Sequence, residues 1–124
     1  MSYTRLNPQT SLQNVNGWVV NRRIDGIAEC WTSRHVTVAS GGWSQWGGIY
    51  EALVCDEQSL PITFAEKPNR RVELYQLDGS PISGFEFGNI SNANTKFPKV
   101  WAWRGNQSNT SITIGVTLFV WGRV

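Results

Sequence analysis

In residues 112–121 aliphatic side chains alternate strictly with other residue types, and this pattern constrains the fold more than any other feature of the chain. Every second position is aliphatic: Ile112, Ile114, Val116, Leu118 and Val120. A period of two is typical of a β-strand that presents one face to a core. No segment of the chain sustains the 3.6-residue period of an amphipathic helix, so the sequence predicts an all-β fold.

Shorter stretches repeat this alternation along the chain. They are Val36 with Val38, Leu60 to Phe64, Arg70 to Leu77, Phe85 with Phe87, and Trp101 with Trp103. Residues 17–31 predict a hairpin around Asp25-Gly26, because a two-residue primed turn needs positive φ angles that Gly adopts freely. A second Asp-Gly pair, at 78–79, ends another predicted strand. Together these segments predict an antiparallel β-sandwich of about eight short strands.

Length and composition indicate one domain. The 124 residues, 40% of them hydrophobic, are enough for a single core. The first eleven or so residues lack a pattern, so we expect residues 1–15 to form a flexible arm and residues 16–124 to form the domain. The start of the chain is too polar for a signal peptide. Cys30 and Cys55 lack the spacing of a metal site or a disulfide framework and are expected to be reduced, partly buried thiols.

The chain offers little chemistry for an enzyme. His35 is the only histidine, and its place in an alternating strand favours a partly exposed structural residue over a general base. Asp25 and Asp78 are accounted for by turns, and no nucleophile, phosphate-loop or metal-ligand motif occurs. Carboxylates that are distant in the sequence can still pair in space. We expect a non-enzymatic protein without a cofactor or metal.

Tryptophan is unusually frequent, with seven residues in a chain of 124. Trp43 and Trp46 fall in a Gly- and Ser-rich loop, where Gln45 and Tyr50 are polar companions. An indole stacks well on the apolar face of a sugar ring while nearby polar groups bind its hydroxyls. These four residues are therefore predicted to bind a ligand, and packing in the core is an equally weighted alternative for the two tryptophans.

A second candidate ligand site follows Trp103. Trp103 runs into Arg104 and the amide-rich turn with Asn106 and Asn109, a set that suits hydroxyls or a carboxylate. An ordinary hairpin loop is the alternative.

Phe119 and Trp121 lie on the face of their strand opposite the aliphatic residues. In an isolated sandwich that face would be wet, so two large hydrophobic side chains there predict an oligomer interface.

Three motifs carry a family resemblance. The hairpin combines Gly17-Trp18, Arg22-Arg23, Asp25-Gly26 and Ala28-Glu29-Cys30-Trp31; a Leu-Pro-x-x-Phe segment spans residues 60–64; and the chain closes in an aromatic strand followed by Gly122-Arg123. In these features residues 16–124 resemble the C-terminal, receptor-binding-type domains of phage and prophage tail-fibre and baseplate proteins, and are similar to the H-type lectins. Val19-Val20-Asn21 departs from the aromatic or basic residues common in the phage domains, and no sugar-binding triad of the lectins can be matched here.

The resemblance implies a trimeric β-sandwich in the virion tail, made in the host cytoplasm. Its partners would be other tail proteins and a bacterial cell-surface glycan, with no membrane insertion. The alternative is a purely structural module that assembles or caps a fibre or baseplate. A single-stranded nucleic-acid binder using the arginines at 22–23 and 70–71 ranks third, because a net charge of +2 hardly supports a basic groove. Exposure of Trp43 and Trp46 would favour glycan binding, and burial of both would favour the structural module.

Overall fold

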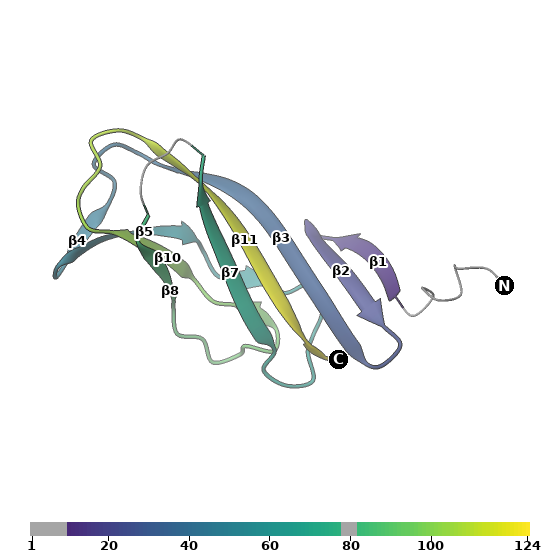
Figure 1. The fold of residues 1–124 in the computed structure, drawn as a ribbon. Coiled ribbons are helices and arrows are strands. Elements are labelled where there is room, and N and C mark those ends of the chain that lie inside the picture. Colours follow the sequence, from purple (N-terminus) through teal and green to yellow (C-terminus); the bar gives the residue numbers. More distant parts are fainter. Residues whose placement is uncertain (1–9, 78–81) are drawn as a thin grey trace.

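A computed structural model describes residues 10–77 and 82–124, and in these ranges the chain is all-β without a helix. Two antiparallel sheets pack against each other, and a third sheet of two short strands lies beside them (Figure 1). The predicted antiparallel β-sandwich is confirmed.

The larger sheet has the strand order β1-β2-β3-β11-β7. Its strands are β1 (Thr10–Val15), β2 (Trp18–Arg23), β3 (Ile27–Val38), β11 (Ile112–Arg123) and β7 (Asn69–Gln76). Strand β11 pairs along its whole length with β3 and over eight positions with β7. It is therefore the central strand, and β1 and β7 are the edges.

The smaller sheet has the order β4-β5-β10-β8. Its strands are β4 (Ser44–Trp46), β5 (Ile49–Cys55), β10 (Val100–Arg104) and β8 (Gly84–Phe87). The two-stranded sheet joins β6 (Gln58–Ser59) to β9 (Lys96–Phe97).

The core lies between the two main sheets. The five aliphatic side chains of β11 are each at most 1% exposed. They belong to one apolar cluster with Val20, Cys30 and Val72 of the larger sheet and Ala52, Val54 and Ala102 of the smaller sheet. The period-two prediction for residues 112–121 therefore identified the correct buried face.

The hairpin between β2 and β3 forms, but its turn differs from the prediction. The register pairs Arg22 with Ala28, which leaves a three-residue loop at 24–26 in place of a two-residue primed turn. Gly26 takes the left-handed position with φ 84°, and the Asp25 carboxylate accepts a hydrogen bond from the Ile27 N–H at 3.1 Å. Gly in this place is typical of three-residue hairpin loops.

A two-residue turn occurs instead at Asn16-Gly17, between β1 and β2. Both residues have positive φ, 52° and 85°, and Val15 pairs with Trp18 across the turn. Residues 10–15, expected to be part of a flexible arm, are therefore a paired strand. Residues 1–9 of that arm lie outside the described residues.

A second correction concerns residues 60–64, which were expected to be a strand. They form an irregular segment in which Phe64 is 1% exposed and its N–H donates to the Asn94 carbonyl at 2.9 Å. The side chains anchor the segment to the core without a strand ladder. The predicted Asp78-Gly79 turn lies outside the described residues.

The two cysteines and the histidine lie as predicted. Cys30 and Cys55 are free and buried, and burial raises the pKa of the Cys30 thiol to about 11. His35 is exposed on the outer face of the larger sheet, edge-on to Tyr75. Within the described ranges, no helix has the length and apolarity needed to cross a membrane.

Candidate functional site

The outer face of the smaller sheet gathers aromatic and acidic side chains around β10. Directly opposite residues of an antiparallel pair share a face. Trp103 lies opposite Glu51 of β5 and Gly84 of β8, and Trp101 lies opposite Leu53 of β5 and Glu86 of β8. We call this surface the tryptophan face; it comprises Glu51, Leu53, Glu86, Trp101 and Trp103, together with Trp46.

Trp103 is held against the backbone of the edge strand. A Cβ atom placed on Gly84 would come within 2.6 Å of Cζ2 of Trp103, so the indole occupies the space that a side chain would fill. Trp101 and Trp103 are both half-buried, which fixes their rings and leaves part of each accessible.

Two carboxyl groups meet beside these tryptophans. Burial, a hydrogen bond to Glu86 and the negative charge of Glu86 together raise the pKa of Glu51 above its ordinary value. The side chains reach each other across β10, which lies between their strands. Such a pair offers several oxygen acceptors on one side of the indoles.

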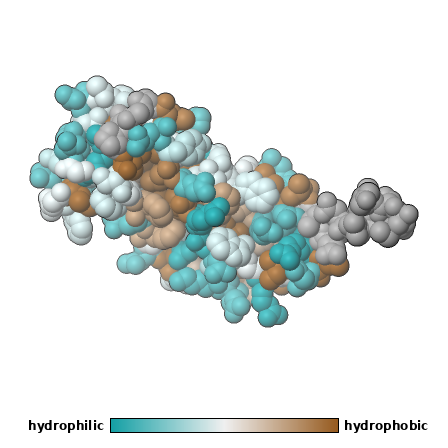
Figure 2. All heavy atoms as spheres, in the orientation of Figure 1, coloured by the Kyte–Doolittle hydropathy of each residue, from teal (hydrophilic) through white to brown (hydrophobic). Residues whose placement is uncertain are grey.

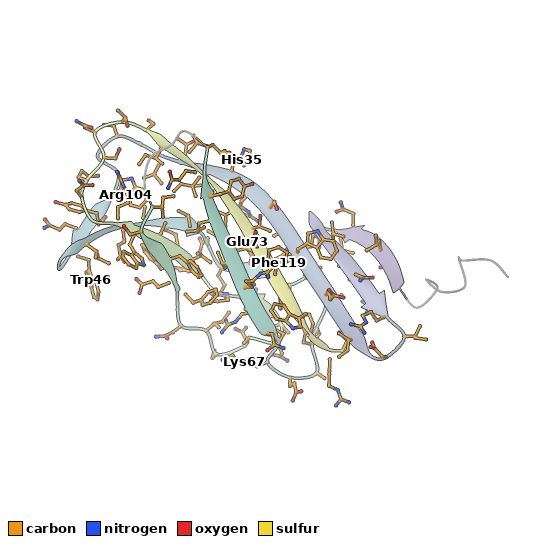
Figure 3. The ribbon with its side chains drawn as sticks, in the orientation of Figure 1. His35, Trp46, Lys67, Glu73, Arg104 and Phe119 are labelled. Carbon is orange, nitrogen blue, oxygen red and sulfur yellow. The ribbon has the colours of Figure 1, made fainter. Side chains whose placement is uncertain are left out.

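Trp46 extends the tryptophan face at its β4 edge. It pairs with Ile49 across the β4–β5 turn, in which Gly47 has φ 60°, and alternation places it on the same face as Glu51. The side chain is 68% exposed and points away from the body of the molecule (Figure 3). It is therefore free to stack on a ligand.

Trp43 and Arg104 are buried, contrary to their predicted place on an exposed binding loop. They are 2% and 7% exposed, and the Arg104 guanidinium lies 5.5 Å from the centre of the Trp43 ring. The prediction failed because Trp43 and Trp46 have similar local sequence, while only Trp43 belongs to the core between the two sheets.

Gln107 joins that loop to Trp43. Its side-chain oxygen accepts hydrogen bonds from the N–H groups of Trp43 (3.2 Å) and Ser108 (3.1 Å), and its amide nitrogen donates to the Trp43 carbonyl (2.6 Å). The Gly41 N–H also donates to the Ser108 carbonyl at 2.8 Å. The loop thus acts as a structural brace, and Gln107 is a residue that sequence reasoning missed.

The other predicted ligand residues do not form one site. Tyr50 pairs with Gln45 and Arg104, so these three share the face opposite to the tryptophan face, and Tyr50 packs against the core. Asn106 and Asn109 are exposed in the bracing loop. Of the predicted set, only Trp46 and Trp103 lie on the tryptophan face.

Sequence reasoning also missed the acidic members of the tryptophan face. Glu51 and Glu86 are 35 positions apart, and only the strand order β5-β10-β8 brings them together. No local pattern contains that information. Trp101 did carry a signal, because it alternates with Trp103.

Phe119 and Trp121 lie on the outer face of the larger sheet, as their alternation predicts. The Arg71 guanidinium lies 4.3 Å from the centre of the Phe119 ring, so the protein partly covers this residue itself. Trp121 is 38% exposed and, with Phe119 and Trp31, lines a depression of about 470 Å³. The predicted interface surface is thus partly apolar and accessible.

The described residues contain no group of three or more His, Cys, Asp or Glu side chains that could hold a metal ion. The tryptophan face instead combines flat apolar rings with hydrogen-bond acceptors. This arrangement can bind a ligand that has both an apolar face and hydroxyl or amine donors.

The fold defines an antiparallel β-sandwich with an aromatic outer face, and solved structures contain a similar fold. No family model and no curated protein matches the sequence. The chain is similar to the fiber of R1 pyocin from P. aeruginosa, in a structure comprising C-terminal residues 323–701, with a TM-score of 0.53 and 16% identity. That likeness covers 97% of this chain and 30% of the pyocin chain, so this chain spans less than a third of the fibre fragment.

An N-truncated R1-type pyocin tail fiber is also similar, with a TM-score of 0.48 and 18% identity over 97% of this chain and 92% of that one. At 16% identity, the likeness to the R1 pyocin fiber concerns the fold alone.

Proposed function

We propose that this protein is a non-catalytic tail-fibre module of a phage or prophage virion that binds a bacterial cell-surface glycan through the tryptophan face. The observation that carries the proposal is the juxtaposition of Trp46, Trp101 and Trp103 with the Glu51–Glu86 carboxyl pair. The fold shared with a segment of the R1 pyocin fiber supports the tail-fibre part of the proposal.

The charge of the tryptophan face specifies the sugar class. Carboxylates accept hydrogen bonds from sugar hydroxyls and attract amines, but they repel acidic sugars. The face carries two carboxyl groups, and Trp46 supplies an exposed stacking surface on the same face. The expected ligands are therefore neutral hexoses or sugars with a free amino group.

Assembly into an oligomer would strengthen weak sites. The resemblance of the sequence to tail-fibre domains favours a trimer that contacts other tail proteins, and linked copies of a weak site gain avidity. The partly apolar depression around Phe119 and Trp121 supports an interface on the larger sheet. Hydrophobic side chains also gather between β7 and β8 (Figure 2), where a groove of about 710 Å³ is lined by Val72, Leu74, Ile82 and Phe85.

A purely structural module is the second candidate; burial of both Trp43 and Trp46 would favour it, and of the two only Trp43 is buried. In that case the apolar outer surfaces only join copies or neighbouring tail proteins. The two candidates differ in whether the assembled protein binds sugar.

The test is a glycan array and a binding assay on bacterial cell walls, with the mass of the protein in solution measured by light scattering. Trp46→Ala and Trp103→Ala should each weaken binding without loss of folding. Tyr75→Ala is the matched control, because Tyr75 is an aromatic residue of the larger sheet and is 41% exposed. Equal binding by all three variants, or an oligomer that binds no glycan, would overturn the proposal and favour the structural module.

A further inference from the structure

A polar pocket of about 380 Å³ lies between two loops at the end of the sandwich that holds the start of β7 and the end of β8. It is lined by Glu66, Lys67, Arg70, Asn89, Ser91 and Asn94, with Gly88, Ile90 and Ala93. Figure 1 shows the loop before β7 and the loop after β8 close together at this end. The volume is at the lower end of the range for small-molecule sites, about 300–1,000 Å³.

Arg70 is a half-buried cation without an ion-pair partner among the described residues. Its Nη1 atom is buried and donates no hydrogen bond to a described group. Its guanidinium instead lies 5.1 Å from the centre of the Phe87 ring. Burial lowers the pKa of Arg70, although guanidinium groups in proteins stay protonated. A buried donor left unpaired is costly, so an acceptor in the pocket would be stabilising.

The rest of the lining also suits an anion. Lys67 supplies a second cation, and Asn89, Asn94 and Ser91 supply amide and hydroxyl donors. Glu66 is the one carboxylate in the lining and forms no ion pair with Lys67 or Arg70. Two cations and one carboxylate leave a formal charge of +1 at the pocket.

Backbone hydrogen bonds hold both loops in place. The Gly88 N–H donates to the Lys99 carbonyl at 2.7 Å, and the Asn94 carbonyl accepts from the Phe64 N–H at 2.9 Å. Asn92 closes a turn with Thr95 and Lys96 through its carbonyl. The lining is therefore formed before a ligand arrives, which limits the entropy lost on binding.

We infer that this pocket binds an oxyanion, a phosphate or carboxylate group, with Arg70 and Lys67 as its principal contacts. A guanidinium presents a fork of donors that matches both groups. The oxyanion is either a free ion or a group carried on a sugar. The pocket is separate from the tryptophan face, since the two share no lining residue and Figure 3 shows Lys67 well away from Trp46. The inference does not depend on the proposed function.

The experiment is a two-dimensional amide NMR titration of the full chain with four probes: inorganic phosphate, glucose 6-phosphate, glucuronate and glucose. We expect saturable shifts at residues 88–94 with the charged probes and none with glucose. Tighter binding of the sugar phosphate or glucuronate than of inorganic phosphate would assign the oxyanion to a glycan. The reverse order would assign the site to a free ion.

Arg70→Gln should weaken binding at least about tenfold, because a charge-assisted hydrogen bond is lost. Arg71→Gln is the matched control, since Arg71 is the next residue, faces the opposite side of the sheet and pairs with Glu73 at 3.4 Å. Lys67→Gln, at an exposed position, gives a second test that does not risk the fold. Equal affinities in all three variants, or shifts with glucose as large as those with the charged probes, would overturn the inference.

Discussion

Replacing Gln107 by alanine tests whether the loop at 105–110 braces Trp43 in the core. The substitution removes three hydrogen bonds of 3.2 Å or less, two accepted from N–H groups and one donated to the Trp43 carbonyl. A neutral hydrogen bond contributes about 1 kcal/mol net, and water can replace part of this at a loop. We therefore expect Gln107→Ala to lower the free energy of unfolding by about 2 kcal/mol.

A loss of this size corresponds to a fall of roughly 5–10 °C in Tm for a domain of this length. The assay is chemical and thermal unfolding followed by tryptophan fluorescence, which also reports the environment of Trp43. Asn106→Ala is the control, because Asn106 is an exposed neighbour in the same loop. It should change the free energy of unfolding by less than about 0.5 kcal/mol.

Gln107→Glu separates the donor from the acceptors. An ionised carboxylate can still accept hydrogen bonds from the N–H groups of Trp43 and Ser108, but it cannot donate to the Trp43 carbonyl and places negative charge against that oxygen. We therefore expect Gln107→Glu to be less stable than wild type at neutral pH. An unchanged Tm in Gln107→Ala would refute the bracing role.

Three further outcomes follow from the structure. Gly84→Ala should displace the Trp103 ring, since the new Cβ would lie 2.6 Å from it, and weaken glycan binding in the array; unchanged binding would contradict the role of the tryptophan face. Trp121→Lys should lower the mass measured by light scattering if the outer face of the larger sheet is an interface, and an unchanged oligomer would argue against that interface. Because burial raises the pKa of Cys30 to about 11 and also raises that of Cys55, both thiols should react with a thiol reagent far more slowly in the native protein than in denaturant. Equal rates would show that the thiols are accessible.

The sequence predicted the parts of the fold that depend on local alternation. Residues 112–121 bury one face because β11 is central and must present its aliphatic side to the smaller sheet. The Asp25-Gly26 signal placed a hairpin correctly but not its loop length, because Asp can also cap a three-residue loop through its carboxylate. The Asn16-Gly17 turn carried an equally strong signal. The strand before it was missed because its polar residues show no apolar face.

The candidate site depended more on long-range contacts. Trp43 and Trp46 are three positions apart, yet only Trp43 packs into the core formed by the two sheets, and Trp46 is 68% exposed. The Glu51–Glu86 pair requires the strand order of the smaller sheet. Neither fact has a signature within a window of the sequence, whereas the shared face of Trp101 and Trp103 follows from their spacing alone.

The central place of β11 also governs when the protein can fold during synthesis. Strand β11 supplies the ladder partners of both β3 and β7, so the larger sheet stays split in two until residues 112–123 have left the ribosome. Until then, the inner edge of β3 and one edge of β7 have no partner. Completion of this sheet is therefore expected to wait for β11, and nascent chains held short of β11 would be prone to pair with one another through those edges.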